Sequence, residues 1–319
     1  MKKETILVIG ANGQVGTALL PELQAVYGND HVIASDLHLP KEERELFLQL
    51  DATQATDIAS VVKKYKVTQI YHLAAVLSAK AEANPVWAWE LNMKTMLNVL
   101  EVAREQALAK VFIPSSIAVF GKDAPKNNTP QDVNLNPSTV YGVSKVAAEK
   151  WFSYYHERYQ TDVRSLRYPG VISHQSMPGG GTTDYAVDIF HKAIAGEAYT
   201  CFLSQDTMLP MIYIEDALRA TIELMEAPAA QISVRSAYNL AGLSFTPAAL
   251  LASIREHYPD FVCHFKPDFR QEIANSWPRS IDDAVAKADW GWQPAYDLPR
   301  LTADMFLHLA AKYQTAAKQ

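Results

Sequence analysis

A tyrosine and a lysine, Tyr141 and Lys145, stand four residues apart and could form an acid–base pair. They open a segment with helical periodicity, and positions i and i+4 of a helix lie on the same face. A neighbouring ammonium favours the phenolate and lowers the pKa of a phenol from its usual value of about 10. Such a tyrosine can act as a general base near neutral pH. In an arbitrary protein, a surface aromatic beside a solvated lysine would explain the same spacing.

Three glycines near the start of the chain form a phosphate-binding pattern. Gly10, Gly13 and Gly16 follow a short apolar segment and precede a helical pattern over Thr17–Ala25. In such a turn the first glycine permits a tight bend, the second lets a pyrophosphate approach the backbone, and the third lets helix and strand pack closely. The free N–H groups at the start of the helix would hold the phosphates. An ordinary turn is the alternative.

Asp36 ends the next expected strand, 20 residues after Gly16. A carboxylate at this place can accept hydrogen bonds from both hydroxyls of an adenosine ribose, and it would repel a 2′-phosphate. The residues that follow, Leu37–Leu39, contain no basic clamp. The pattern therefore predicts a bound dinucleotide and favours NAD over NADP, with a helix N-cap as the alternative role of Asp36.

Short β-rich segments alternate with longer helical patterns through the first half of the chain, which is typical of a parallel sheet covered by helices. The expected strands are Thr5–Ile9, His31–Ser35, Gln69–Leu73, Lys110–Pro114 and Asp162–Arg167. The expected covering helices are Thr56–Tyr65, Trp87–Gln106 and Val143–Tyr159. We predict an α/β fold: a Rossmann-type, doubly wound parallel sheet with a smaller C-terminal α/β substrate lobe.

The alternation of strand and helix patterns ends after Tyr168. There, prolines and the run Gly179–Gly181 predict a loop that could act as a hinge or lid. Ile212–Leu224 has the pattern of a strand followed by a helix, and Ala237–Leu240 that of another strand, so we expect the chain to return to the first lobe. The predicted domains are 1–168 with about 212–240 for NAD binding, and about 169–211 with 241–319 for the substrate.

Composition excludes several classes of protein. The chain has 319 residues, 49% hydrophobic, and a net charge of −6, with mixed charges and no basic block, so we expect neither nucleic acid nor membrane as a partner. Cys201 and Cys263 are the only cysteines, and no export signal is recognisable, which favours the cytoplasm. The nine histidines are scattered without short ligand spacings. We therefore expect no metal site and a structural role for His72.

The order of these motifs strongly resembles the extended short-chain dehydrogenase/reductase family. The segments that carry the resemblance are the three glycines, Asp36, His72–Ala75, Pro114–Gly121 and the Tyr141…Lys145 pair, and Pro278–Pro294 is similar to that family's C-terminal region. The resemblance implies that Tyr141 is the general base, that Lys145 binds the nicotinamide ribose and tunes the tyrosine, and that Ser116 orients the substrate oxygen. Ser115 is the alternative to Ser116.

The same resemblance places a set of residues against the cofactor NAD. They are Gly10, Gly13, Gln14, Val15, Gly16, Asp36, Asp51, Ala52, Leu73, Ala74, Ala75, Asn92, Tyr141, Lys145 and Tyr168. Two of these have alternative roles: Asp51 could cap a helix before Thr53, and Asn92 could simply pack within its helix.

Within this family, the segment Arg167–Val187 is closely similar to the short-chain type of NAD-dependent L-threonine 3-dehydrogenases, as are His72–Lys80 and Pro114–Ile117. The implied reaction oxidises the 3-hydroxyl of L-threonine to 2-amino-3-oxobutyrate, with the tyrosine as base and hydride transfer to NAD. The implied substrate contacts are Ser78, Ser116, Tyr141, Gly179, Thr182, Thr183 and Trp277, with Asp184 as a weaker candidate. Trp277 could instead pack at the boundary between lobes.

Alternative functions on this scaffold are a nucleotide-sugar 4-epimerase or dehydratase and a non-catalytic NAD sensor. No arginine or lysine lies between Tyr168 and His191, although a nucleotide-sugar enzyme must neutralise a pyrophosphate. The resemblance also implies a homodimer through the helices Trp87–Gln106 and Val143–Tyr159. It implies metabolic coupling to a glycine-forming CoA ligase, because the product is unstable toward decarboxylation.

Overall fold

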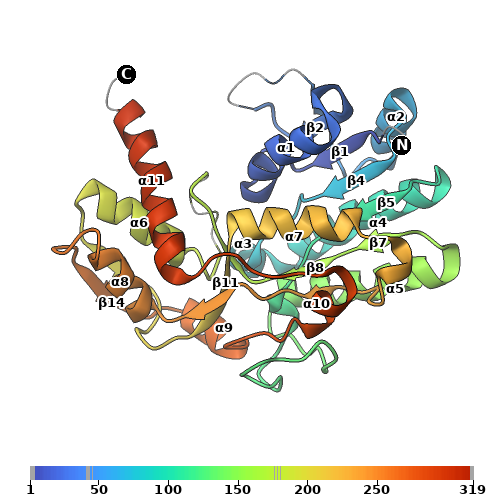
Figure 1. The fold of residues 1–319 in the computed structure, drawn as a ribbon. Helices are drawn as coiled ribbons and strands as arrows, with labels where there is room; N and C mark the ends of the chain where they lie inside the picture. The colour runs from blue at the N-terminus through green and yellow to red at the C-terminus, as the bar shows by residue number, and fades with distance from the viewer. Residues whose placement is uncertain are drawn as a thin grey trace.

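The computed structural model describes residues 4–40, 44, 46–175, 177, 179 and 181–316. Its centre is a six-stranded sheet of parallel strands in the order β3-β2-β1-β4-β5-β7 (Figure 1). The strands are β1 (Ile6–Ile9), β2 (Val32–Asp36), β3 (Phe47–Gln49), β4 (Gln69–His72), β5 (Lys110–Phe112) and β7 (Val163–Arg164). The strand order reverses between β1 and β4, and ligands of such sheets bind outside the carboxyl ends at this switch point.

Helices cover both faces of this sheet, each with its own apolar core (Figure 1). One face carries α1 (Gln14–Tyr27) and α7 (Ile214–Glu226). The other carries α2 (Ala55–Tyr65), α4 (Pro85–Glu105) and α5 (Val140–Tyr159). The sheet strands are buried on both faces because helices lie on each side, which explains their continuous aliphatic runs. The predicted α/β fold with a parallel, doubly wound sheet is confirmed.

Three smaller sheets complete the chain. They are β6 (Ser115–Ser116), β8 (Leu166–Tyr168) and β12 (Tyr238–Asn239); β9 (Gly170–Ile172), β11 (Leu209–Tyr213) and β13 (Leu243–Phe245); and β10 (Tyr199–Cys201) with β14 (Cys263–Phe265). The other helices are α3 (Ser78–Ala83), α6 (Tyr185–Ala195), α8 (Pro247–Arg255), α9 (Arg270–Ser276), α10 (Ala284–Trp290) and α11 (Leu298–Ala316), with one-turn 3-10 helices η1 (Asn29–His31), η2 (Ile117–Val119) and η3 (Ala229–Gln231). No helix in the described part of the chain is long and apolar enough to cross a bilayer.

Two strand predictions need correction. Phe47–Gln49 forms an edge strand that we did not predict, because it is only three residues long and partly exposed. The single strand expected over Asp162–Arg167 is interrupted at Ser165. Val163–Arg164 pairs with β5, whereas Leu166–Tyr168 pairs with β6 and β12, so the chain changes sheets between them. The predicted strand near Ala237 is present as β12, and its pairing with β8 brings this late segment beside the first half of the chain.

The start of α5 is fixed by three local interactions. The Thr139 hydroxyl caps the helix by accepting a hydrogen bond from the Gly142 N–H at 3.1 Å, and the Glu82 carboxylate accepts one from the Val140 N–H at 2.8 Å. A Cβ added at Gly142 would lie 2.2 Å from the Ala118 carbonyl oxygen and 2.6 Å from Pro137 Cβ. The first turn of α5 therefore rests directly on the backbone that follows β6.

We expect Gly142→Ala to lower the free energy of unfolding by about 2 kcal/mol, because overpacking outweighs the roughly 1 kcal/mol that alanine gains in a helix. Urea denaturation measures the difference. Gly196→Ala is the matched control, since Gly196 has φ +68° and no atom within 4 Å of an added Cβ, and only backbone strain of about 1 kcal/mol is expected. A Gly142→Ala protein at least as stable as the wild type would contradict this packing.

Candidate active site

The glycine turn between β1 and α1 brings two loops into backbone contact. Gly10 has φ +88°, and a Cβ there would lie 2.6 Å from the backbone nitrogen of Ala74, just after β4. A Cβ on Gly16 would lie 2.3 Å from the Gly10 carbonyl oxygen. At Gly13, the N-cap of α1, only that same carbonyl oxygen lies near, at 3.3 Å. Gly10 and Gly16 are thus required by packing, whereas Gly13 leaves the start of α1 open.

Two adjoining cavities meet at this turn. We name them by their titratable residues: the acidic cavity contains Asp36 and Asp51, and the tyrosine cavity contains Tyr141. They share the residues Gly10, Gly13, Leu73 and Ala75, so they form one continuous cleft along the carboxyl ends of β1 and β4. This is the switch point of the sheet, where a ligand of this fold is expected.

Five of the predicted cofactor residues line the acidic cavity and do not line the tyrosine cavity. They are Asp36, Asp51, Ala52, Ala74 and Asn92. Asp36 accepts hydrogen bonds from the N–H groups of Asn12 at 3.0 Å and His38 at 3.3 Å, and no described helix begins there, so it is not an N-cap. Asp51 accepts from the Thr53 N–H at 2.9 Å. The helix that follows, α2, begins at Ala55 with Gln54 as its N-cap, so Asp51 closes the turn before the helix without capping it, and it remains in the cavity wall.

Asn92 holds the other side of this cavity in place. From α4, its side chain accepts a hydrogen bond from the Val76 N–H at 2.8 Å and donates to the Val76 carbonyl at 3.1 Å. The pair of bonds replaces strand partners that residue 76 lacks beyond β4. Asn92 is therefore a partner of the backbone that lines the cleft, rather than a residue that only packs within its helix.

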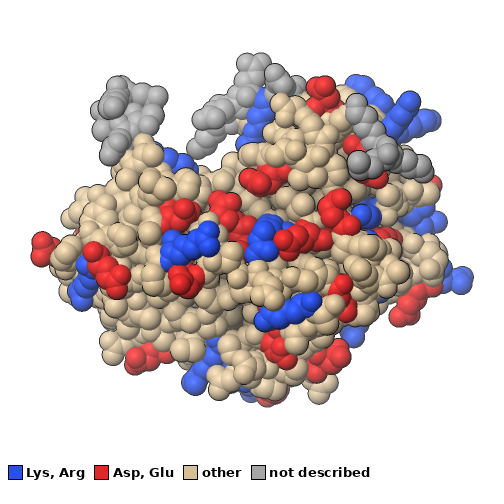
Figure 2. All heavy atoms as spheres, in the orientation of Figure 1, with Lys and Arg blue, Asp and Glu red and all other residues tan. Residues whose placement is uncertain are grey.

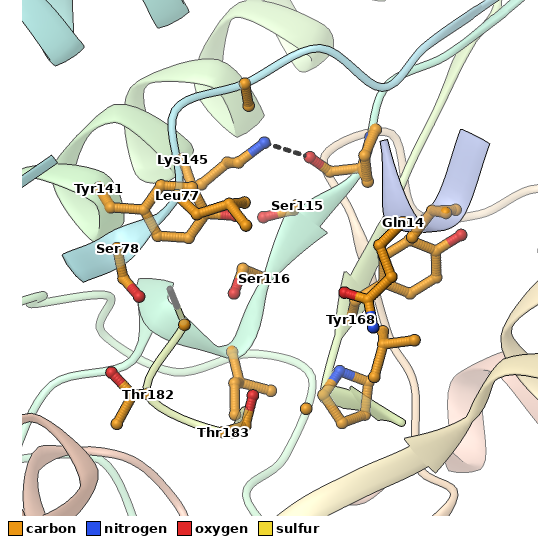
Figure 3. Close-up of a pocket in the computed structure, with 18 of the residues that line it drawn as sticks. Gln14, Leu77, Ser78, Ser115, Ser116, Tyr141, Lys145, Tyr168, Thr182 and Thr183 are labelled. Atoms are coloured by element: carbon orange, nitrogen blue, oxygen red, sulfur yellow. Dashed lines mark hydrogen bonds between the residues drawn. The ribbon is translucent and has the colours of Figure 1, made fainter. Parts of the chain in front are cut away.

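Lys145 and Tyr141 lie together in the tyrosine cavity (Figure 3). The Lys145 ammonium donates a hydrogen bond to the Pro114 carbonyl at 2.6 Å and lies 5.5 Å from the centre of the Tyr141 ring. Burial lowers the pKa of Lys145 to about 8, against an opposing effect of the Glu149 carboxylate. Burial beside this ammonium lowers the pKa of His72 to about 3, so that imidazole is neutral.

The expected lowering of the Tyr141 pKa is not found in the free protein. Burial removes the hydroxyl from water and raises its pKa to about 12, and only a hydrogen bond with Ser116 opposes this. The spacing of two residues on a helix predicts that their side chains are neighbours, but it does not predict how deeply those side chains are buried away from water. In the free protein, Tyr141 is therefore protonated near neutral pH.

The two neighbouring serines of β6 have different surroundings. The Ser115 hydroxyl donates to the buried carboxylate of Glu149 at 2.6 Å and is engaged there. The Ser116 hydroxyl accepts a hydrogen bond from the Ala118 N–H at 3.2 Å and faces the tyrosine cavity (Figure 3). The geometry therefore favours Ser116 over Ser115 as the hydroxyl that works with Tyr141.

All but one of the predicted substrate contacts line the tyrosine cavity. They are Ser78, Ser116, Tyr141, Thr182, Thr183 and Trp277, together with the weaker candidate Asp184. Figure 3 labels the first five of them. Thr182 is buried, and its hydroxyl has no hydrogen-bond partner among the described residues. Gly179 does not line the cavity; an added Cβ there would contact Leu77. Gly181 lines it instead, while Pro178 and Gly180 lie outside the described residues.

Trp277 is held in the cavity wall by a lysine from a distant loop. The Lys126 ammonium donates to the carbonyls of Asn275, Ser276 and Trp277 at 3.0, 3.0 and 3.2 Å, which satisfies the end of α9. Trp277 is only 6% exposed. Trp277 is therefore packed between elements, as the alternative interpretation expected, and it also lines the tyrosine cavity.

The remaining predicted cofactor residues, Gln14, Val15 and Tyr168, also line the tyrosine cavity, although the Tyr168 hydroxyl bonds to Thr221. We missed several lining residues. In the tyrosine cavity they are Leu77, Pro114, Ile117, Pro169, Gly170, Val171 and Gly181, and in the acidic cavity Leu37, Leu50, Thr53, Val76, Leu91 and Thr95. Most of these missed residues are apolar, and the hydrophobic pattern of the sequence does not distinguish them from core residues. Among the lining residues of the tyrosine cavity only Lys145 and Asp184 are charged.

Charge is mixed on the face shown in Figure 2, where acidic and basic side chains alternate without a block of one sign. In the described part of the chain, no three histidine, cysteine or acidic side chains lie close enough together to hold a metal ion.

Comparison with known proteins agrees with this geometry. A family model described as the NAD dependent epimerase/dehydratase family matches residues 6–241. A protein of Staphylococcus saprophyticus, described as an uncharacterized epimerase/dehydratase, is 46% identical over the full length of both chains. The solved structure of a GalE-like L-threonine dehydrogenase from Cupriavidus necator is 54% identical, with a TM-score of 0.93 over 97% of this chain and 99% of that one.

A second solved structure, of a monomeric L-threonine 3-dehydrogenase from a metagenome, is 45% identical, with a TM-score of 0.94 over 97% of this chain and 99% of that one. The family model covers most of the chain, and these relatives cover nearly all of it. The chain therefore belongs to the NAD-dependent epimerase/dehydratase family, in the extended group of short-chain dehydrogenases/reductases.

Proposed function

We propose that this protein is an NAD-dependent L-threonine 3-dehydrogenase that converts L-threonine to 2-amino-3-oxobutyrate. One observation carries the proposal: Tyr141, Lys145 and Ser116 share a cavity with the hydroxyls of Ser78 and Thr182, and that cavity continues into the glycine turn. The solved relatives described as threonine dehydrogenases, at 54% and 45% identity, support it.

The cleft fits NAD on two structural grounds. The open start of α1 at Gly13 would accept a pyrophosphate, because free N–H groups and the helix dipole favour an anion there. The Asp36 carboxylate lies in the acidic cavity, where it would accept the ribose hydroxyls. Bound NAD supplies the hydride acceptor for the reaction. We assign binding of NAD to residues 1–168 with about 212–240, and binding of the substrate to about 169–211 with 241–319.

The catalytic roles follow from the positions of the side chains. The Tyr141 oxygen takes the proton of the threonine 3-hydroxyl, while Cβ of threonine loses hydride and becomes a carbonyl carbon. Lys145, held by the Pro114 carbonyl, stabilises the phenolate through its ammonium. Ser116 donates a hydrogen bond to the reacting oxygen. Lys145 is buried, and Tyr141 and Ser116 are half-buried, so little water reaches the site, which strengthens these interactions.

The size and charge of the cavity favour a small zwitterion. A nucleotide sugar needs cationic side chains for its pyrophosphate. Among the described residues that line the tyrosine cavity, Lys145 is the only cation, and the Pro114 carbonyl engages it. The unpartnered Thr182 hydroxyl, with Ser78 and Thr183 nearby, can bond the carboxylate or ammonium of an amino acid.

We also propose a homodimer formed by α4 and α5, in the cytoplasm. These helices expose large apolar side chains in the isolated chain: Val86, Trp87 and Trp89 on α4, and Val143, Trp151, Tyr154 and Tyr159 on α5. Monomeric proteins rarely expose so many large apolar side chains together.

Because the product is a β-keto acid that decarboxylates readily, a glycine-forming CoA ligase is the expected metabolic partner.

We expect sedimentation equilibrium to give twice the chain mass of 35.5 kDa. Trp87→Glu combined with Trp151→Glu should convert the protein to monomers, because buried charges without partners oppose association. A paired substitution of exposed apolar residues elsewhere, Val262→Glu with Leu307→Glu, is the control. A wild-type mass of 35.5 kDa would refute the dimer.

We expect L-threonine and NAD to give NADH absorbance at 340 nm, and Tyr141→Phe to lower kcat about 10³-fold while leaving NAD affinity intact, because only the proton acceptor is lost. Tyr65→Phe on α2, far from the cleft, is the matched control and should keep full activity. Parallel samples contain L-allo-threonine, L-serine and UDP-glucose. Turnover of UDP-glucose without NADH from threonine would overturn the proposal in favour of an epimerase.

Asp36→Asn should weaken NAD binding about tenfold and reduce the preference for NAD over NADP, because the repulsion of a 2′-phosphate is lost. Dissociation constants for both cofactors, measured by calorimetry, give the result. Asp51→Asn, in the same cavity, controls for the loss of a carboxylate as such and should leave the NAD/NADP ratio unchanged. An unchanged ratio in Asp36→Asn would show that discrimination lies elsewhere.

A further inference from the structure

A buried ion pair lies one helical turn beyond Lys145. The Arg167 guanidinium, on β8, donates to the two carboxylate oxygens of Glu149, on α5, at 3.0 and 2.8 Å. The side chains are 4% and 1% exposed. Ser115 donates to the same carboxylate at 2.6 Å. Two charges withdrawn from water in this way are costly, and replacement by apolar residues is often neutral or stabilising, so stability alone does not explain the pair.

The pair joins the elements that carry the acid–base residues. Arg167 also donates to the Gln131 carbonyl and to Asn239 Oδ1, both at 2.9 Å. These bonds connect α5, which contains Tyr141 and Lys145, with β8, β12 and the strand β6 of the two serines. Ser116 is therefore one residue away from a side chain that the Glu149 carboxylate holds.

The charges around Lys145 identify the group that acts on it. The titratable neighbours of Lys145 are His72 on β4 and Tyr141 and Glu149 on α5, with Arg167 paired to Glu149. Asp184, just before α6, lines the same cavity as Lys145. His72 is neutral because its pKa is lowered to about 3, and the Pro114 carbonyl that Lys145 bonds is uncharged. The Glu149 carboxylate is the group that opposes the effect of burial on the pKa of Lys145.

We propose that Glu149 is a positioning residue for the acid–base set: its carboxylate, fixed by Arg167, keeps the buried Lys145 as an ammonium and anchors β6 through Ser115. The ion pair is thus retained for the charge state of Lys145 as well as for the fold. This role rests on the proposed function only in that Lys145 contacts bound NAD, and it is measured without threonine. Loss of threonine oxidation would therefore leave it standing.

The test is the pH dependence of NAD affinity, measured by calorimetry on the full protein. Only the ammonium form of Lys145 donates to ribose hydroxyls with full charge, so the affinity of the wild type should fall as pH rises through about 8. In Glu149→Gln the supporting negative charge is gone, and the midpoint should move to lower pH by about one unit. In Lys145→Met the dependence should vanish, which assigns the midpoint to this lysine.

Two variants separate charge from packing. Glu149→Asp keeps the carboxylate but shortens its reach, so it should lose stability while its midpoint stays close to that of the wild type. Asp162→Asn breaks another ion pair, with the buried Arg164 at 2.8 Å, and neither of these residues lines the cavities that contain Lys145. It should lower the urea midpoint of unfolding without moving the pH midpoint.

Glu149→Gln leaves Arg167 buried without its partner and can fail to fold. The double variant Glu149→Gln with Arg167→Gln removes both charges, and its midpoint should still move to lower pH, because the carboxylate and not the guanidinium acts on Lys145. An unchanged midpoint in either variant, or an equal shift in Asp162→Asn, would reduce Glu149 to a structural residue and overturn the proposal.

Discussion

The buried hydrogen bond from the Lys145 ammonium to the Pro114 carbonyl is the contact on which the site depends. A lysine that has left water must find acceptors, since an unpaired buried charge costs several kcal/mol. The acceptor is available because β5 ends at Phe112 and the chain bends into β6, which frees a carbonyl at the carboxyl end of the sheet. The end of one strand therefore fixes both the orientation of α5 and the position of Tyr141 in the cleft.

Close backbone contacts make this arrangement rigid. Gly10 touches the backbone at Ala74, and Gly142 touches the carbonyl of Ala118, so α1, β4, β6 and α5 meet at distances that no side chain would permit. Asn92 then bonds both backbone polar groups of Val76 and holds the wall of the acidic cavity in place. The cleft consequently depends on glycines, which lack a side chain, at the carboxyl edge of the sheet. The backbone contacts at these glycines also fix the acidic cavity relative to the tyrosine cavity.

Periodicity and spacing predicted much of this from the sequence. The glycine turn and the parallel sheet follow from local rules of pattern and spacing. The helical spacing of Tyr141 and Lys145 predicts that they are neighbours, whereas the place of Ser116 beside them came from the family resemblance. The edge strand at Phe47 escaped because a partly exposed three-residue strand has no pattern of its own. The direction of the shift in the Tyr141 pKa was predicted wrongly. The desolvation that raises this pKa depends on β6, α3 and the segment 181–184, which are remote in sequence. Gly181 replaced Gly179 in the cavity wall for a similar reason, since the path of a loop is a tertiary property.

The mixed character of the cavity limits the chemistry that this scaffold can perform. Gly170 lies so close to Thr183 that an added Cβ would be 2.7 Å from its methyl group, so β9 and the start of α6 meet across a narrow gap. Hydroxyl groups line much of the remaining space, and Lys145, the one cation among the described lining residues, is engaged by a backbone carbonyl. The small polar substrate that we propose would fit these walls, although the family is named for epimerases and dehydratases. Substrate selectivity on this fold then depends on two features of the cavity lining: small side chains at close backbone contacts, and few cationic side chains that could bind a phosphate. These features matter as much as the hydroxyl groups that the lining presents.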